Sequence, residues 1–173
     1  MNYVDEARLF DNYFQHNLDE WSTYCFCKNT IEDTSSALLN YEKKGLGKDY
    51  DEKYLRLYGM LQAVFLQQDA IEQLYNLFIR SKLSNKGSNW TKTRDIRNMS
   101  VGHPIEYKRK GIIKRTSISM VTISDKGFQL VVWDKQTQKR KFMDVDLRKI
   151  YEGYKKEAIK ALETIYLKLP QFS

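Results

Sequence analysis

The sequence predicts a mainly α-helical protein, a bundle of four to five helices with a small antiparallel β-hairpin or meander inserted before the last helix. Apolar residues recur at steps of three and four over long segments, as they do along the buried side of a helix. Only two prolines and eight glycines occur in 173 residues, which favours long elements. One segment instead alternates polar and apolar side chains, as a half-buried strand does. We therefore expect a single domain, 1–173, with a β insertion over 105–145.

The first helix is expected over residues 4–41, and the polar stretch 29–36 predicts a kink or a break within it. Residues 45–49, with two glycines, form a loop. The second helix begins at Asp51, and apolar residues cover much of its circumference. Such a helix is either central to the bundle, or packs on the core with one side and on a partner subunit with the other.

A turn over 84–89 precedes a short third helix, expected over 90–101, with Ser88 or Asn89 as its cap. Gly102 and Pro104 end this helix. Strands are expected over 117–123, 128–133 and 139–145, and the helical period returns from Asp146 in a closing helix.

The net charge of +7 is concentrated in one segment. Residues 104–149 hold twelve Lys or Arg against five Asp or Glu, and the rest of the chain holds seventeen of each. With the interleaved aromatic residues Tyr107, Phe128, Trp133 and Phe142, this charge predicts phosphate contacts and base stacking, and the alternative is a solvated charged hairpin. The expected nucleic-acid contacts are Lys108, Arg109, Lys110, Lys114, Arg115, Lys139, Arg140 and Lys141.

The remaining composition predicts no metal and no cofactor. Cys25 and Cys27 lie two apart on an expected helix, where they point to different sides, and the two histidines are far apart. We expect two free thiols in a cytoplasmic protein, since residues 1–6 do not resemble a secretion signal and no apolar run is long enough for a membrane span. His16 is expected to be a surface or packing residue.

The third helix ends in the motif Arg97-Asn98-Met99-Ser100-Val101-Gly102-His103-Pro104. An arginine holds a phosphate with several fixed N–H donors, and a histidine gives or takes a proton near neutral pH. The motif resembles the Arg–polar–x–His signature of the HEPN superfamily of helical RNA-cleaving proteins, and the helical layout is similar to the bundle of that superfamily.

This resemblance implies a homodimeric, metal-independent endoribonuclease that cleaves RNA to a 2′,3′-cyclic phosphate and a 5′-hydroxyl. Arg97 would bind the scissile phosphate, His103 would be the general acid or base, and Asn98 would orient one of them or the RNA. A toxin or defence effector restrained by an inhibitory protein partner fits this activity.

Two alternatives come from other classes of function. Because the superfamily includes members that do not cleave RNA, the chain is otherwise a non-catalytic nucleic-acid-binding or regulatory module. The third hypothesis is a protein–protein adaptor that uses the broad apolar second helix.

Arg97 and His103 are six positions apart, so on a regular helix their side chains would point about 120° from each other. Either the backbone leaves the helical path at His103, or the arginine of one protomer meets the histidine of the other across a twofold axis. Asp69, Glu72 and Arg94 are candidates to support the site, and the alternative for the polar residues of the second helix is a satisfied hydrogen-bond network or a solvated strip.

Overall fold

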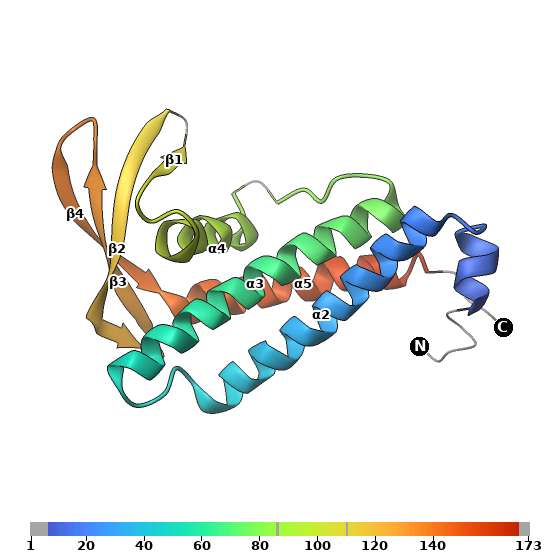
Figure 1. Ribbon diagram of the computed structural model, residues 1–173, viewed down its shortest axis with the longest axis horizontal. Coiled ribbons are helices and arrows are strands. Elements are labelled where there is room, and N and C mark those ends of the chain that lie inside the picture. The colour runs from blue at the N-terminus through green and yellow to red at the C-terminus, as the bar shows by residue number, and fades with distance from the viewer. Residues whose placement is uncertain (1–6, 86, 110, 170–173) are drawn as a thin grey trace.

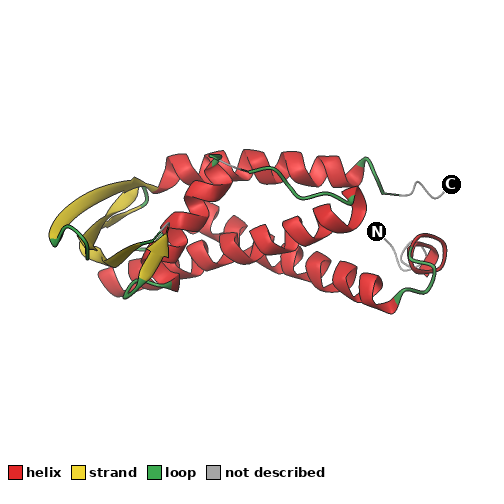
Figure 2. Cartoon of the chain, turned by 90° about the horizontal axis from the view of Figure 1, so that it is seen from above, coloured by secondary structure: helices red, strands yellow, loops and turns green. Residues whose placement is uncertain are grey.

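The computed structural model describes residues 7–85, 87–109 and 111–169, and shows long helices with an antiparallel sheet at one end (Figure 1). The long helices are α2 (Leu18–Lys44), α3 (Tyr50–Ile79) and α5 (Leu147–Tyr166). The short helix α4 (Asn89–Arg97) lies beside the sheet, and Figure 2 shows that the strands are confined to the same end of the molecule. The predicted class, mainly helical with a small antiparallel sheet before the last helix, is confirmed.

The first helical segment is divided earlier than the sequence predicted. A π-helical turn, Leu9–Tyr13, is separated from α2 by Gln15 and His16, whose φ angles are 48° and 62°. Asn17 then caps α2, its side chain accepting a hydrogen bond from Glu20 N at 3.2 Å. His16 is exposed, as expected, while residues 4–6 of the predicted helix lie outside the described residues.

The break predicted over residues 29–36 is wrong, because α2 runs through them without interruption. The hydroxyl of Thr30 donates to the carbonyl of Phe26 at 2.8 Å, and that of Thr34 donates to the carbonyl of Thr30 at 2.6 Å. These side chains are paired to the carbonyls one turn earlier, so the polar residues remain compatible with a helix.

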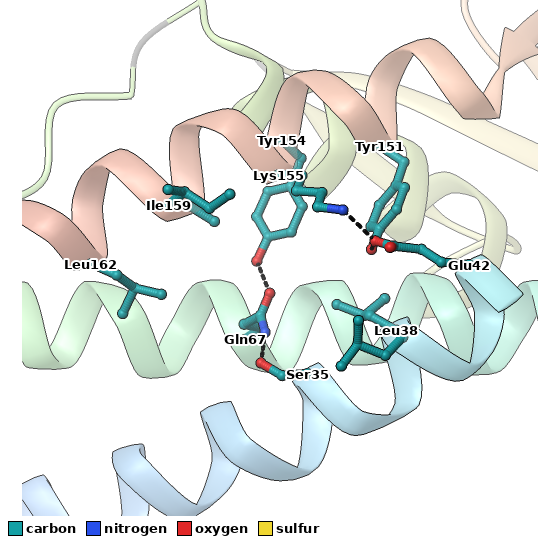
Figure 3. A pocket seen from close by; sticks show the side chains of 11 residues that line it. Ser35, Leu38, Glu42, Gln67, Tyr151, Tyr154, Lys155, Ile159 and Leu162 are labelled. Carbon is teal, nitrogen blue, oxygen red and sulfur yellow. Dashed lines mark hydrogen bonds and ion pairs between the residues drawn. The ribbon is translucent and has the colours of Figure 1, made fainter. Parts of the chain in front are cut away.

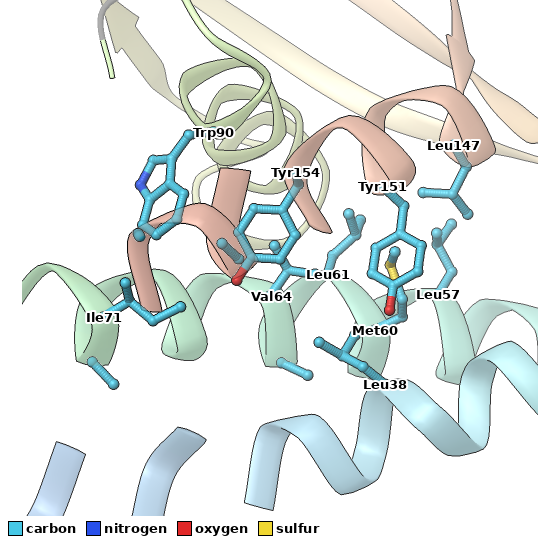
Figure 4. Close-up of a cluster of buried hydrophobic side chains, with 14 of the residues drawn as sticks. Leu38, Leu57, Met60, Leu61, Val64, Ile71, Trp90, Leu147, Tyr151 and Tyr154 are labelled. Atoms are coloured by element: carbon cyan, nitrogen blue, oxygen red, sulfur yellow. The ribbon is translucent and has the colours of Figure 1, made fainter. Parts of the chain in front are cut away.

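Helix α3 is the central helix, and this confirms one of the two expectations for it. It packs against α2, α4, α5 and the sheet. Leu61, Val64 and Ile71 of α3 face Tyr154 of α5 and Trp90 of α4 in the core, and all of these side chains are fully or almost fully buried (Figure 4). Burial on several sides explains why so much of the circumference of α3 is apolar.

The sheet is a meander of four antiparallel strands in the order β1-β2-β3-β4. The strands are β1 (Tyr107–Arg109), β2 (Ile112–Ser124), β3 (Gly127–Asp134) and β4 (Lys139–Asp146). The last three correspond to the predicted strands, whereas β1 was not predicted, because three residues are too few to show an alternation. One face of the sheet packs on the helices, and its buried side chains are Tyr107, Thr116, Ile118, Phe128, Leu130, Val132 and Val145.

Hydrogen bonds at two aspartates help to fix the sheet to the helical body. Asp125, in the turn between β2 and β3, accepts a hydrogen bond from Leu46 N at 2.7 Å, in the loop that follows α2. Asp146 ends β4 and caps α5, accepting from Lys149 N at 2.8 Å. The chain therefore passes from the sheet into the last helix with no intervening loop.

Cys25 and Cys27 are not joined in a disulfide; Cys27 is buried and Cys25 is partly buried. Among the described residues, no helix combines the length and apolar character that crossing a membrane requires.

Candidate functional site

Helix α4 carries the first part of the motif and is positioned by contacts with other parts of the chain. Its cap is Ser88, whose Oγ accepts from Thr91 N at 3.4 Å. The carboxylate of Glu157, on α5, accepts from Asn89 N at 3.0 Å and from Trp90 N at 2.8 Å. A helix of nine residues is too short to be stable alone, so these contacts and the burial of Trp90 determine where α4 lies.

The rest of the motif forms a π-helical turn, Asn98–Gly102, closed by a hydrogen bond of 2.7 Å from His103 N to the carbonyl of Asn98. Strand β2 holds this turn. Thr116 N donates to the carbonyl of Pro104 at 2.6 Å, and the Thr116 hydroxyl donates to the carbonyl of Met99. Wide turns of this kind occur often at functional sites.

His103 follows the π-helical turn and lies outside the helical path, with φ −138° and ψ 51°. The backbone therefore departs from the helical path at His103, as one of the two predicted solutions to the spacing problem requires, but this departure alone does not bring the two side chains into contact. The imidazole is exposed, and in the described part of the chain no hydrogen bond or ion pair joins it to Arg97.

The Arg97 guanidinium is held by two neutral amides and one aromatic ring. Its Nε and Nη2 donate to Oε1 of Gln62 at 3.2 and 2.7 Å, and Nη1 donates to Oδ1 of Asn98 at 3.0 Å. The guanidinium carbon lies 3.9 Å from the centre of the Phe65 ring. Since a guanidinium has five N–H groups, two remain for an external acceptor. Asn98 is bonded to both ends of the motif, to Arg97 by its side chain and to His103 by its carbonyl.

Gly102 provides the space in which the guanidinium lies. A Cβ atom at this position would stand 2.4 Å from Nη1 of Arg97 and 3.3 Å from Oδ1 of Asn98. The absence of a side chain at residue 102 is therefore a condition for the observed placement of Arg97.

Arg94 and Arg97 differ in their counter-ions. Arg94 Nη2 lies 2.5 Å from a carboxylate oxygen of Asp69 and 3.7 Å from one of Glu72. Arg97 forms no ion pair with any described carboxylate, and burial lowers its pKa, although not enough to neutralise an arginine. Arg94 is thus paired directly with carboxylates, whereas the charge of Asp69 acts on Arg97 only from a distance, without an ion pair.

Asp69, Glu72 and Arg94, the three residues predicted to support the site, lie together in one network of hydrogen bonds and ion pairs. Asp69 pairs with Arg94, whose guanidinium carbon lies 4.9 Å from the centre of the Phe65 ring. Glu72 accepts from the Trp90 indole at 2.7 Å and from the Asn85 amide at 2.9 Å. These contacts orient α4 against α3, and they agree with the alternative of a satisfied network for the polar residues of α3.

Two residues that contact Arg97 were not predicted as part of the site. Gln62 and Phe65 lie on α3, at steps of three and four from Asp69. That spacing indicates a common side of the helix. The predicted role of Asp69 pointed to this side of α3, but the sequence contained no sign that the contact extends to Gln62 and Phe65.

The basic residues of the insertion are divided between two faces of the sheet. Strand register places Lys114, Lys139 and Lys141 on the face that includes buried Val132. Lys108, Arg115 and Arg140 lie on the opposite face. Arg109 is in β1, and Lys110 lies outside the described residues. The expectation that Tyr107 and Phe128 stack on bases is wrong, because both are buried between the sheet and the helices.

A cavity of about 210 Å³ lies away from the motif, between α2, α3 and α5 (Figure 3). Its polar groups bind one another. The Tyr154 hydroxyl donates to Oε1 of Gln67 at 2.8 Å, and the Gln67 amide donates to Ser35 at 2.9 Å. Glu42 accepts from Tyr151 at 2.7 Å and from Lys155 at 2.8 Å. We interpret this cavity as a packing defect lined by satisfied groups.

Comparison with protein-family models, with curated proteins and with solved structures finds no match to this chain.

Proposed function

We propose that this chain is a HEPN-like, metal-independent endoribonuclease. The observation that carries the proposal is Arg97, a cation that is held by hydrogen bonds to neutral partners, forms no ion pair with a described carboxylate and retains two N–H donors. An exposed histidine follows it after one wide turn. Fixed donors of this kind stabilise the negative charge that develops on a phosphate during cleavage, and the RNA supplies its own nucleophile.

In the proposed reaction the 2′-oxygen attacks the phosphorus and the bond to the 5′-oxygen breaks, giving a 2′,3′-cyclic phosphate. The proton of the 2′-hydroxyl leaves as the bond forms, and the 5′-oxygen gains a proton as it departs. His103 takes the first proton or gives the second, for which a positioned imidazole typically contributes about 10²–10⁴-fold. Arg97 binds the phosphate. Asn98 orients the Arg97 guanidinium through its side chain and holds the backbone of His103 through its carbonyl.

The first test is cleavage of RNA in EDTA by the wild-type protein, with Arg97→Ala and His103→Ala purified alongside. We expect cleavage by the wild type alone, with folding intact in both variants. Arg94→Ala tests a neighbouring arginine whose charge is already neutralised by Asp69. Cleavage by the wild type that requires a divalent cation would contradict the proposal.

We further propose that two protomers complete one another's sites, because no bond joins Arg97 to His103 within a chain. Mixing Arg97→Ala with His103→Ala tests this arrangement. A heterodimer of the two variants has one intact site if Arg97 and His103 come from different protomers, and none if they come from the same protomer. Recovery of activity on mixing supports the shared site, and no recovery from a mixture shown to contain heterodimers contradicts it.

A non-catalytic nucleic-acid-binding module is the second candidate, and the same missing contact between Arg97 and His103 favours it. It predicts that the wild type binds diverse RNAs in a salt-sensitive manner and cuts none of them.

A further inference from the structure

The outward face of the sheet groups two aromatic residues with cationic ones. Val132 of β3 is buried against the helices, so the adjacent residue Trp133 lies on the opposite face. Strand register pairs Trp133 with Arg115 on β2 and with Arg140 on β4. One cross-strand row thus reads arginine, tryptophan, arginine.

A second aromatic residue lies diagonally next to Trp133. Phe142 of β4 pairs with Val131 and is 63% exposed. Residues diagonal to each other on one face of a sheet are about 7–8 Å apart, so the two side chains are neighbours on this face. An exposed phenylalanine is unusual on an edge strand, since such strands commonly carry features that prevent association with other chains.

The charges on this face are not compensated. Lys108, Arg115 and Arg140 form no ion pair with a described carboxylate. The acidic residues that the register places on this face, Asp144 and Asp146, lie further along β4. The Asp144 carboxylate accepts from the Gln129 amide at 2.9 Å, and Asp146 caps α5. Phe142 is exposed and Trp133 is partly exposed, and rings placed between such cations suit a partner with flat apolar groups and regularly spaced negative charges.

We infer that the outward face of the sheet binds single-stranded RNA, with bases stacked on Trp133 and Phe142 and phosphates bound by Arg115, Arg140 and Lys108. Unpaired bases present the ring faces that stack on aromatic side chains, whereas a duplex offers its phosphates without them. The inference rests on the proposed function for the choice of RNA among polyanions. The opposite face of the same sheet contacts the π-helical turn of the motif, so RNA bound here is delivered to the end of the molecule that holds Arg97.

The test uses a labelled, 2′-O-methylated single strand of about twelve nucleotides, which cannot be cleaved, and the same sequence as a duplex. Phe142→Ala should raise the Kd for the single strand by about 5- to 150-fold. The combined Arg115→Ala and Arg140→Ala variant should reduce the slope of log K against log salt by about 1.4. Tyr166→Ala is the matched aromatic control, since Tyr166 is 64% exposed on α5. Lys156→Ala with Lys160→Ala, two exposed cations of α5, is the charge control.

Sheet variants that bind like their controls would overturn the inference, and so would a Phe142→Ala effect of equal size on the duplex. The inference would also be overturned if this face bound an acidic protein and did not bind the single strand. Because the strand is uncleavable, this result is independent of the nuclease proposal. If the wild type cleaves RNA and the sheet variants bind normally, only the binding face is wrong. If the wild type cleaves nothing while Phe142→Ala loses binding, only the nuclease proposal is wrong.

Discussion

The substitution Gly102→Ala tests the arginine site most directly, because it adds one methyl group where the guanidinium lies. The new Cβ would stand 2.4 Å from Nη1 of Arg97, and ordinary contact begins at 3.4 Å, so Nη1 must retreat by about 1 Å. Oδ1 of Asn98, which accepts from Nη1, is also crowded, at 3.3 Å. The methyl group therefore disrupts this hydrogen bond from both sides.

A displacement of this size matters more for reaction than for folding. Misplacing a catalytic group by 1 Å lowers the reaction rate about 100-fold. We expect a reduction of that size in the rate of RNA cleavage. The hydrogen bond of a charged group, about 1.5–3 kcal/mol, is opposed by the better helix propensity of alanine, about 1 kcal/mol. The free energy of unfolding should fall by no more than about 2 kcal/mol.

The assay combines cleavage rates with the NMR signal of the Arg97 Nε–H group, which reports the position of the guanidinium without reference to activity. Gly59→Ala is the matched control, because Gly59 is exposed on α3 and a Cβ there meets nothing within 4 Å. We expect Gly59→Ala to be slightly more stable and fully active. Wild-type cleavage together with an unchanged Arg97 signal in Gly102→Ala would refute the reasoning.

Three further predictions concern stability. Glu157→Ala should lower the free energy of unfolding in urea by about 2–3 kcal/mol, since it leaves backbone N–H groups of α4 without acceptors, while Glu152→Ala on the exposed side of α5 should change it by no more than about 0.5 kcal/mol. Ser100→Ala should raise the melting temperature, because the Ser100 hydroxyl is a buried polar atom without a partner in the described part of the chain; a lower melting temperature would indicate a bound water. Burial, and then the charge of Asp125, raise the pKa of Tyr41 to about 12. Since the unfolded pKa is about 10, the contribution of Tyr41 to stability is complete below pH 10 and is lost between about pH 10 and 12. Tyr41→Phe should show a weaker loss of stability in that interval, and an identical pH profile would contradict this assignment.

The long helices could be predicted from sequence because their signals are local. The apolar spacing of α3 and α5 and the cap at Asp146 depend on neighbours within one or two turns. The prediction of a break in α2 was wrong for a local reason as well. Threonine hydroxyls in this segment donate to carbonyls one turn earlier, and polar composition alone does not reveal this.

The site could be predicted only in part. Arg97, Asn98 and His103 were evident as a motif, whereas Gln62 and Phe65 contact Arg97 through the packing of α4 on α3, which no spacing within either helix specifies. The same limit applies to the sheet. Alternation identified its strands, but which face is buried depends on where the helices lie, and that decides between Phe128 and Phe142 as an exposed ring.

The dependence of α4 on Glu157 has a consequence for the order in which the molecule becomes functional. The helix that carries Arg97 is too short to persist alone, and its first turn is held by a carboxylate 67 positions further along the chain from Trp90. The π-helical turn that follows it is held by Thr116, in the sheet. A growing chain that ends at the motif therefore contains every proposed catalytic residue. It lacks the contacts that hold these residues in their positions in the folded protein. We therefore expect the guanidinium to become fixed only after the last helix has been synthesised and has docked, so that the arginine site forms with completion of the fold.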